Sequence, residues 1–169
     1  MTKPYKTTLL DQYLRQARIS ILEADMKTRQ KLVDTIYDNI ADRQKRYAKD
    51  RIALESLAFQ LHNLYCAFEC LFRIVANHFE NLVIKQKAHN KKLLDRMKTN
   101  IEDIRPSLIS ESAFTLLSEL RDFRYIFRHD YRVKLEPAKI KIVLKKALAL
   151  RKIYQKDVTV FLSQLKPKR

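Results

Sequence analysis

Apolar side chains recur through the central part of the chain at the three- and four-residue spacing of an α-helix. The pattern is clearest from Arg51 to Phe79. Its apolar positions are Leu54, Leu57, Ala58, Leu61, Leu64, Tyr65, Phe68, Leu71, Phe72, Val75 and Phe79. Because residues at this spacing share one side of a helix, they form a wide apolar stripe. The segment is therefore predicted to be a long helix in the core.

The N-terminal segment from Thr8 to Tyr47 has a less regular pattern. Its apolar positions form a broken stripe: Leu9, Leu14, Ile21, Leu22, Leu32, Val33, Ile36 and Ile40. The break predicts one long helix or two, with an irregular point near Asp25.

Prolines divide the C-terminal half, because proline is rarely tolerated inside a helix. We expect a short helix from His89 to Thr99 and then a loop from Ile101 to Ile109, which contains Pro106. The next helix should be capped by Ser110 or Ser112, since serine accepts a hydrogen bond from the first turn. Its predicted apolar face is Ala113, Leu116, Leu120, Phe123 and Phe127.

The last predicted helix runs from about residue 137 to 165 and begins at Pro137, which suits a first turn. Its apolar stripe is Ile140, Val143, Leu144, Ala147, Leu150, Tyr154, Val158 and Phe161. The opposite face carries Lys139, Lys141, Lys145, Lys146, Lys152 and Lys156.

The 169 residues include no glycine. Phosphate-binding loops, dinucleotide-binding fingerprints and strand-to-helix nucleophile elbows all need glycine, so these enzyme classes are excluded. Tight β-hairpins are disfavoured for the same reason. We therefore predict an all-α protein, a single domain over residues 1–169 that forms an up-and-down bundle of about five helices.

The chain carries a net charge of +16, which is concentrated at its C-terminal end. Residues 131–169 contain twelve lysines or arginines and two acidic residues. A surface of this kind attracts a polyanion, either nucleic acid or an acidic protein. The alternative is a basic face that only keeps the protein soluble.

The run LHNLYCAFE, residues 61–69, places polar groups among apolar ones. Asn63, Tyr65 and Glu69 need partners there, and they form either a structural hydrogen-bond network or the support of a site on another helix. His62, Cys66 and Cys70 also share one helix face. Three ligands on one helix are a weak indication of zinc, so packing of reduced thiols is favoured and no metal is predicted.

The segment RDFRYIFRHDY, residues 121–131, mixes dense charge with large apolar residues. Arg121, Arg124 and Arg128 recur at a spacing where like charges repel, so a carboxylate or a bound phosphate should offset them. A basic C-terminal turn that interacts with the helix dipole is the alternative. In an ideal helix Arg124 and His129 point about 140° apart. They converge only if the helix ends between them or if a second subunit contributes.

Arg124, His129 and Tyr131 together form the pattern Arg-x4-His-x-Tyr, which resembles the motif of the HEPN ribonucleases and in particular of the HepT toxins. The flanking sequences LHNLYCAFECLFRIVANHF, AHNKKLLDRM and IRPSLIS resemble successive family elements. The similarity covers roughly Ala53 to Phe161. One departure is Tyr125, where many members have a small polar residue.

The resemblance implies a metal-independent endoribonuclease that needs no cofactor and acts on RNA, with tRNA as the expected substrate. His129 would move protons, because imidazole titrates near neutral pH. Arg124 would stabilise the charge that develops on the phosphate. Arg121, Arg128 and Arg132 would contact RNA. The resemblance also implies a homodimer whose two motifs line one cleft.

The HepT resemblance implies further that the chain is the toxin of a type II toxin-antitoxin pair. The antitoxin would be an MNT-type nucleotidyltransferase that neutralises the toxin by attaching AMP to Tyr131. The added phosphate would bring negative charge beside the arginines.

Two other functions fit the same sequence. One is a helical module that binds nucleic acid without cutting it, and the other is a bundle whose basic face docks an acidic protein. The chain begins without the apolar core of a signal peptide and has no apolar stretch of membrane-spanning length, so we expect no membrane partner and a cytoplasmic, prokaryotic location.

Overall fold

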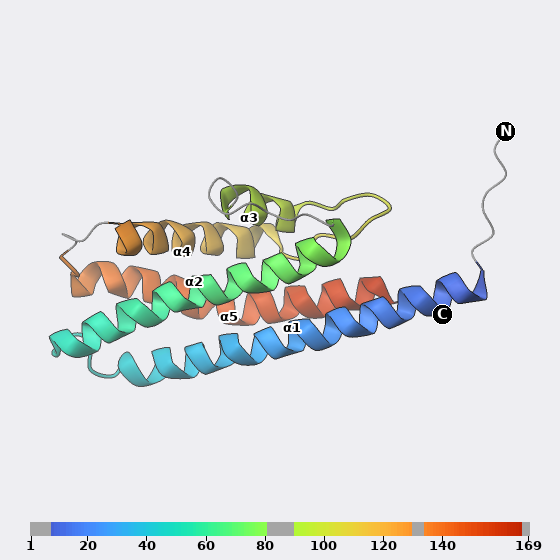
Figure 1. Cartoon of the computed structure of the whole chain (residues 1–169). Coiled ribbons are helices and arrows are strands. Elements are labelled where there is room, and N and C mark those ends of the chain that lie inside the picture. The colour runs from blue at the N-terminus through green and yellow to red at the C-terminus, as the bar shows by residue number, and fades with distance from the viewer. Residues whose placement is uncertain (1–7, 81–89, 130–133, 167–169) are drawn as a thin grey trace.

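A computed structural model describes residues 8–80, 90–129 and 134–166, and within these ranges the chain forms five α-helices and no strand. The helices are α1 (Leu9–Arg43), α2 (Arg51–Glu80), α3 (Asn90–Lys98), α4 (Glu111–His129) and α5 (Pro137–Leu165). Successive long helices, α1, α2, α4 and α5, alternate in direction, and the short α3 packs against α2 and α4 (Figure 1). The predicted all-α bundle is confirmed.

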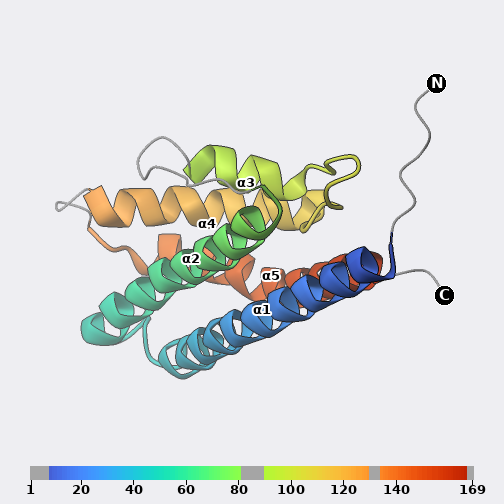
Figure 2. The same cartoon turned by 45° about the vertical axis from the view of Figure 1, so that its right-hand side comes forward.

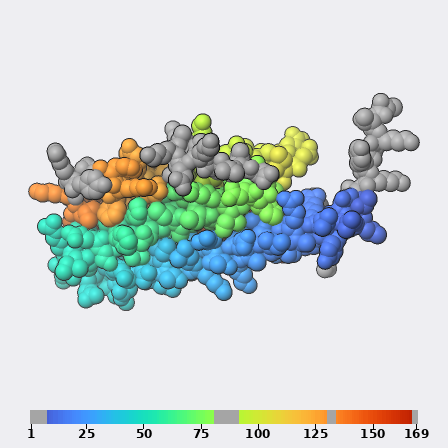
Figure 3. Space-filling view, viewed as in Figure 1, coloured from blue at the N-terminus to red at the C-terminus, as the bar shows by residue number. Residues whose placement is uncertain are grey.

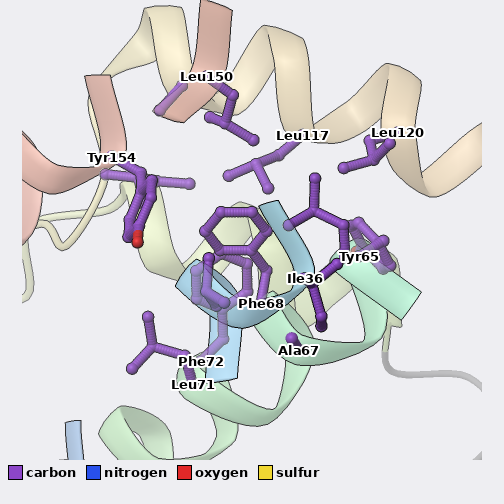
Figure 4. Packing of buried hydrophobic residues seen from close by; sticks show 14 of the residues in the cluster. Ile36, Tyr65, Ala67, Phe68, Leu71, Phe72, Leu117, Leu120, Leu150 and Tyr154 are labelled. Carbon is purple, nitrogen blue, oxygen red and sulfur yellow. The ribbon is translucent and has the colours of Figure 1, made fainter. Parts of the chain in front are cut away.

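The core lies among the four long helices and is centred on α2. Phe68 contacts Tyr154 of α5 edge to face, with 4.9 Å between ring centroids, and packs beside Phe72. Leu117 of α4 and Leu150 of α5 lie close to these rings (Figure 4). The buried side of α2 is the stripe that its sequence predicts, and this wide contact holds the remaining helices in place.

Helix α1 is continuous, so the irregular point expected near Asp25 is wrong. It begins with a capping box, in which Thr8 and Asp11 satisfy each other's backbone N–H groups. Its apolar residues belong to two different faces. Leu22, Val33 and the neighbouring isoleucines are buried, whereas others of the predicted stripe are exposed: Leu9, Leu14, Ile21 and Leu32. Two overlapping stripes on one helix look like a single broken one in the sequence.

Helices α4 and α5 begin at the predicted residues. Ser110 caps α4 by accepting a hydrogen bond from the Ala113 N–H at 3.3 Å. Ser110 also donates its own N–H and hydroxyl to Asp157 of α5, both at 2.8 Å, which ties the start of α4 to the neighbouring helix. Pro137 occupies the first turn of α5 after Glu136. On α4 the predicted Ala113 and Leu120 are buried, but Leu117 is buried as well and the predicted Leu116 is only half-buried.

The segment between α3 and α4 is the predicted loop, and an arginine holds it in place. Arg105 is fully buried and donates five hydrogen bonds. Two of them reach Glu80 of α2, at 3.0 and 2.7 Å, and three reach backbone carbonyls. Arg96 of α3 binds the other oxygen of Glu80 at 2.6 Å. This Glu80 cluster (Glu80, Arg96 and Arg105) fastens α3 and the loop to the end of α2. His89, expected in this helix, lies outside the described residues.

Candidate active site

The segment singled out in the sequence forms the last two turns of α4. Phe123 and Phe127 are half-buried, stack at 5.8 Å and pack against the core. Because they lie on the inward side of the helix, they orient the neighbouring residue Arg124 toward α2. The bundle thereby brings α4 arginines against the polar residues of α2.

Arg124 contacts three residues of α2. Its Nη2 lies 3.2 Å from Glu69 Oε2, and its Nε donates to Cys66 Sγ at 3.4 Å. The guanidinium carbon also lies 5.6 Å from the centre of the Tyr65 ring, within the range of a cation–π interaction. The Arg124 side chain is only 12% exposed. Three α2 residues therefore hold this guanidinium in one orientation.

Glu69 is the centre of this group, because its two oxygens bind two different arginines. Arg124 takes Oε2, and Arg73 of the next α2 turn donates to Oε1 at 2.5 Å. The Glu69 side chain is 6% exposed, and such a buried charge is tolerated only when it is paired and hydrogen-bonded. We call Glu69, Arg73 and Arg124 the Glu69 cluster. Arg73 was not anticipated from the sequence.

Only two of the three predicted support residues contact Arg124. Glu69 and Tyr65 contact it directly. Asn63 is half-buried and makes no side-chain hydrogen bond to any described residue, so the structure does not bring it into the group. Burial raises the pKa of the Tyr65 phenol, and the Glu69 charge raises it further, so Tyr65 stays neutral. Burial alone would lower the Arg124 pKa, but the Cys66 contact and the Glu69 charge outweigh it and the net shift is upward.

His62 is a residue of this site that sequence reasoning considered only as a metal ligand. Its ring lies between Phe59 and Phe127, with centroid distances of 6.4 and 5.5 Å, and its Nε2 is 3.7 Å from Cys66 Sγ. Burial lowers the pKa of His62, and the charges of Arg124 and Arg128 lower it further. The sequence shows that His62 and Cys66 share a helix face, but it does not show that Arg124 of α4 packs beside them.

The second cysteine corrects an expectation. Cys70 is exposed and Cys66 is half-buried, so the two thiols do not pack in the core as predicted. The two cysteines are four residues apart at the edge of the apolar stripe of α2. At this edge Cys66 contacts Arg124 of α4, whereas Cys70 is exposed to solvent. Among the described residues, no group of three or more metal-binding side chains comes together.

His129 is exposed at the end of α4, where its Nδ1 lies 2.9 Å from the carbonyl oxygen of Tyr125. A carbonyl can only accept a hydrogen bond, so Nδ1 carries the proton and Nε2 carries the lone pair in the neutral ring. The Tyr125 ring lies 4.5 Å from the imidazole. Tyr125, the departure from the family motif, thus contacts the predicted proton-transfer residue through both its backbone and its ring.

Arg124 and His129 do not converge within one chain. Helix α4 continues through both residues, so it does not end between them, and that alternative is wrong. Arg124 faces α2, while His129 lies along the exposed face with Tyr125. The other explanation, that a second subunit completes the pair, stays a prediction.

The other predicted RNA contacts lie close to this end of α4. Arg121 binds its neighbour Asp122 at 3.0 Å with an 18% exposed side chain, and Arg128 is exposed. The expected carboxylate partners of the arginine row are therefore present: Asp122 for Arg121, and Glu69 for Arg124. Tyr131 and Arg132 lie outside the described residues.

Comparison with known proteins identifies the family of the chain. Searches of curated proteins and of solved structures give no match. Within the described residues, no helix is both long and apolar enough to cross a bilayer. The family model described as HepT-like protein matches residues 56–165, which include α3, α4, α5 and most of α2. The chain therefore belongs to the HepT-like family of the HEPN superfamily, a family related to toxins and nucleases.

Proposed function

We propose that the protein is the toxin of a type II toxin-antitoxin pair and acts as a metal-independent endoribonuclease, with tRNA as its substrate. The observation that carries this proposal is the orientation of His129. Its bond to the Tyr125 carbonyl leaves Nε2 as the basic nitrogen on an exposed helix end, beside the basic residue Arg128. Family membership supports the same reaction class.

RNA supplies the nucleophile for this reaction. His129 Nε2 takes the proton of a ribose 2′-hydroxyl, whose oxygen attacks the adjacent phosphorus. The bond to the 5′-oxygen breaks, and a protonated imidazole returns a proton to that leaving oxygen. The products are a 2′,3′-cyclic phosphate and a 5′-hydroxyl end. Proton transfer by imidazole and charge stabilisation by guanidinium account for each step.

Arg124 stabilises the negative charge of the pentacoordinate phosphate in this mechanism. Its contacts to Cys66 and Glu69 use Nε and one nitrogen of the fork, Nη2, so the planar group is held before substrate binds. Because Arg124 and His129 lie on different sides of α4, we propose that two copies form a dimer in which both motifs line one cleft. Arg121, Arg128 and Arg132 contact the RNA backbone there.

Regulation is proposed to act on Tyr131. An MNT-type nucleotidyltransferase antitoxin transfers AMP from ATP to the phenol, with release of pyrophosphate. The new phosphodiester carries a negative charge two residues after His129, where it competes with RNA phosphate for the arginines. The AMP group also adds bulk at the entrance to the cleft.

The test is cleavage of total tRNA in EDTA by the wild-type protein and by His129→Ala and Arg124→Ala. Both variants should lose about a hundredfold or more in rate, as expected when a proton-transfer group or a charge-stabilising donor is removed. His78→Ala is the matched control, since His78 is a half-buried histidine of α2 that lines a groove with Arg18 and Phe79 and does not contact the candidate site. Unchanged cleavage by both site variants would rule the proposal out.

A second candidate is a helical protein that binds nucleic acid without cutting it. The low exposure of Arg124 and its pairing with Glu69 favour this alternative, because a neutralised guanidinium is well suited to hold two helices together. It predicts salt-dependent RNA binding with the substrate left intact. Measuring binding and cleavage on the same RNA separates the two functions, and intact RNA in both EDTA and magnesium would favour the binder.

A further inference from the structure

The N-terminal part of α1 projects beyond the rest of the bundle. The first buried residue of α1 is Ile19, ten residues after its start at Leu9. Ile19 is level with the ends of α2 and α5, because it lines one groove with Phe79 and Leu165. The first turns of α1 extend past these ends (Figures 1 and 3), and a second view shows the same helix end lying clear of α3 and α4 (Figure 2).

This projecting part carries an exposed apolar stripe on a different side of α1 from its buried residues, and one member of the stripe, Leu14, also lines the groove with Phe79. Leu10, Leu14, Ala17 and Ile21 follow one another at intervals of four, three and four residues, which is the heptad spacing of a coiled coil. Around the helix axis, the middle of this stripe lies about 140° from the middle of the buried side of α1, which begins at Ile19. Leu10, Leu14 and Ile21 are 65%, 51% and 60% exposed. Large apolar residues in such a row indicate a docking surface.

The polar groups beside the stripe do not oppose docking. Ser20 and Thr28 both turn their hydroxyls back onto the helix, to the carbonyls of Gln16 and Ala24 at 3.1 Å. Their hydrogen bonds are therefore made within α1 and would not be lost when a partner covers the helix. The capping box at Thr8 also keeps the first turn helical without any partner.

The charge of α1 distinguishes it from the rest of the chain. The helix contains six acidic and six basic residues and carries no net charge, whereas the whole protein carries +16. Two copies of the chain repel each other over most of their surfaces, but not where α1 meets α1. A polyanion, in contrast, gains nothing from this neutral helix. The occupant that suits the stripe best is therefore another α1.

The positions that flank the stripe select one orientation. In a parallel pair Arg18 would face Tyr13, and Asp25 would face Ser20, so no opposite charges meet. In an antiparallel pair Asp11 of each copy faces Arg18 of the other, and the two-fold symmetry makes this contact twice. Asp11 and Arg18 are both exposed. The antiparallel orientation also keeps the two +16 bundles at opposite ends of the joined helices.

We propose that a second copy of this chain docks on the stripe of Leu10, Leu14, Ala17 and Ile21 through an antiparallel pairing of the two α1 helices. This interface lies outside residues 56–165, which match the family model, and it is separate from the cleft dimer proposed above. It does not depend on ribonuclease activity. Two heptads form a small interface, so association is expected at about micromolar concentration.

Sedimentation equilibrium over a micromolar concentration series tests the interface. Leu14→Glu and Ile21→Glu should each halve the mass of the wild-type assembly. Ile142→Glu is the matched control, because Ile142 is 56% exposed on α5 and the same substitution there should leave the mass unchanged. Thermal melting should show that all three variants stay folded, since each position is exposed. An unchanged mass for both α1 variants, or the same loss with the control, overturns the inference.

A charge exchange tests the orientation. Arg18→Glu should weaken association by placing like charges together, and adding Asp11→Lys should restore it; the second change removes the Asp11 half of the capping box and leaves the Thr8 cap in place. A double variant that stays dissociated overturns the antiparallel pairing. If the α1 variants keep their mass but no longer capture the nucleotidyltransferase antitoxin, the stripe serves that protein and the second-copy inference is wrong.

Discussion

Two glutamates of α2 each bind two arginines, yet the two clusters differ in how completely they are satisfied. In the Glu80 cluster, Arg105 is fully buried and donates five hydrogen bonds, which uses every donor of its guanidinium. In the Glu69 cluster, Arg124 is 12% and Arg73 39% exposed, and Arg73 Nε is buried without a partner in the described part of the chain.

This difference separates a structural clamp, the Glu80 cluster, from the candidate site, the Glu69 cluster. A fully satisfied arginine such as Arg105 has no donor left for a ligand, and moving it would break its bonds to one oxygen of Glu80 and to three carbonyls. Arg124 is held by fewer bonds and lies beside the exposed end of α4. An incomplete set of partners is what a side chain needs if it is to bind a phosphate as well. Each cluster is a glutamate paired with two arginines, and the burial and hydrogen bonds of Arg105 distinguish the clamp from the Glu69 cluster.

The largest expected effect comes from breaking the clamp. Arg105→Ala should lower the free energy of unfolding by about 3–5 kcal/mol, because it leaves the buried Glu80 charge with half of its partners. Chemical denaturation of the variant and the wild-type protein measures this. A loss of less than about 1 kcal/mol, the value of an exposed pair, would contradict the assignment.

The next effect compares the two glutamates directly. Glu69→Gln should cost about 1–3 kcal/mol of stability, less than Glu80→Gln, since Arg105 of the Glu80 cluster is fully buried whereas both arginines of the Glu69 cluster are partly exposed. For the rate of tRNA cleavage, the larger loss should instead come from Glu69→Gln. Glu69→Gln releases Arg124 and should slow cleavage about tenfold or more, whereas Glu80→Gln should leave the rate per folded molecule unchanged. Equal rates for the two variants would remove the distinction between clamp and site.

A smaller effect concerns pH. The pKa of His62 is lowered in the folded protein by burial and then by Arg124 and Arg128. Below the unfolded pKa of about 6.5, the unfolded chain therefore binds more protons, and stability falls with falling pH. His62→Gln should reduce the difference in melting temperature between neutral and mildly acidic buffer. His129→Gln is the control, because His129 is exposed and should change that difference less. An identical pH dependence in wild-type protein and His62→Gln would contradict this role.

The smallest expected effect is the loss of an exposed ion pair, which serves as a reference for the buried ones. Arg51 binds Glu55 on the same helix at 3.1 Å, but both side chains are largely exposed. Arg51→Ala should change the free energy of unfolding by no more than about 0.5 kcal/mol. A clearly larger loss in the same denaturation experiment would mean that exposure does not separate weak from strong ion pairs in this protein.

Several features of the fold and the site could be predicted from local patterns. The α2 stripe, the Ser110 cap and the Pro137 start each depend on residues a few positions apart, and the structure confirms all three. Glu69 was expected to join either a structural network or the support of a site on another helix, and its ion pair with Arg124 of α4 is compatible with both. The two faces of α1 could not be separated, because hydrophobicity alone does not tell a core stripe from a docking stripe.

The sequence by itself determined the elements of this protein. The absence of glycine, the apolar spacing of α2 and the positions of the prolines lead to a helical bundle, and the spacing of Arg124, His129 and Tyr131 leads to its family. These properties are local and survive in any arrangement of the helices. Tertiary structure alone decided that Arg124 meets Glu69 and Cys66, 55 and 58 residues earlier in the chain, while His129 faces solvent. The physical reason is that helix packing fixes which faces meet, and that choice depends on the shape and burial of the whole core rather than on any short segment.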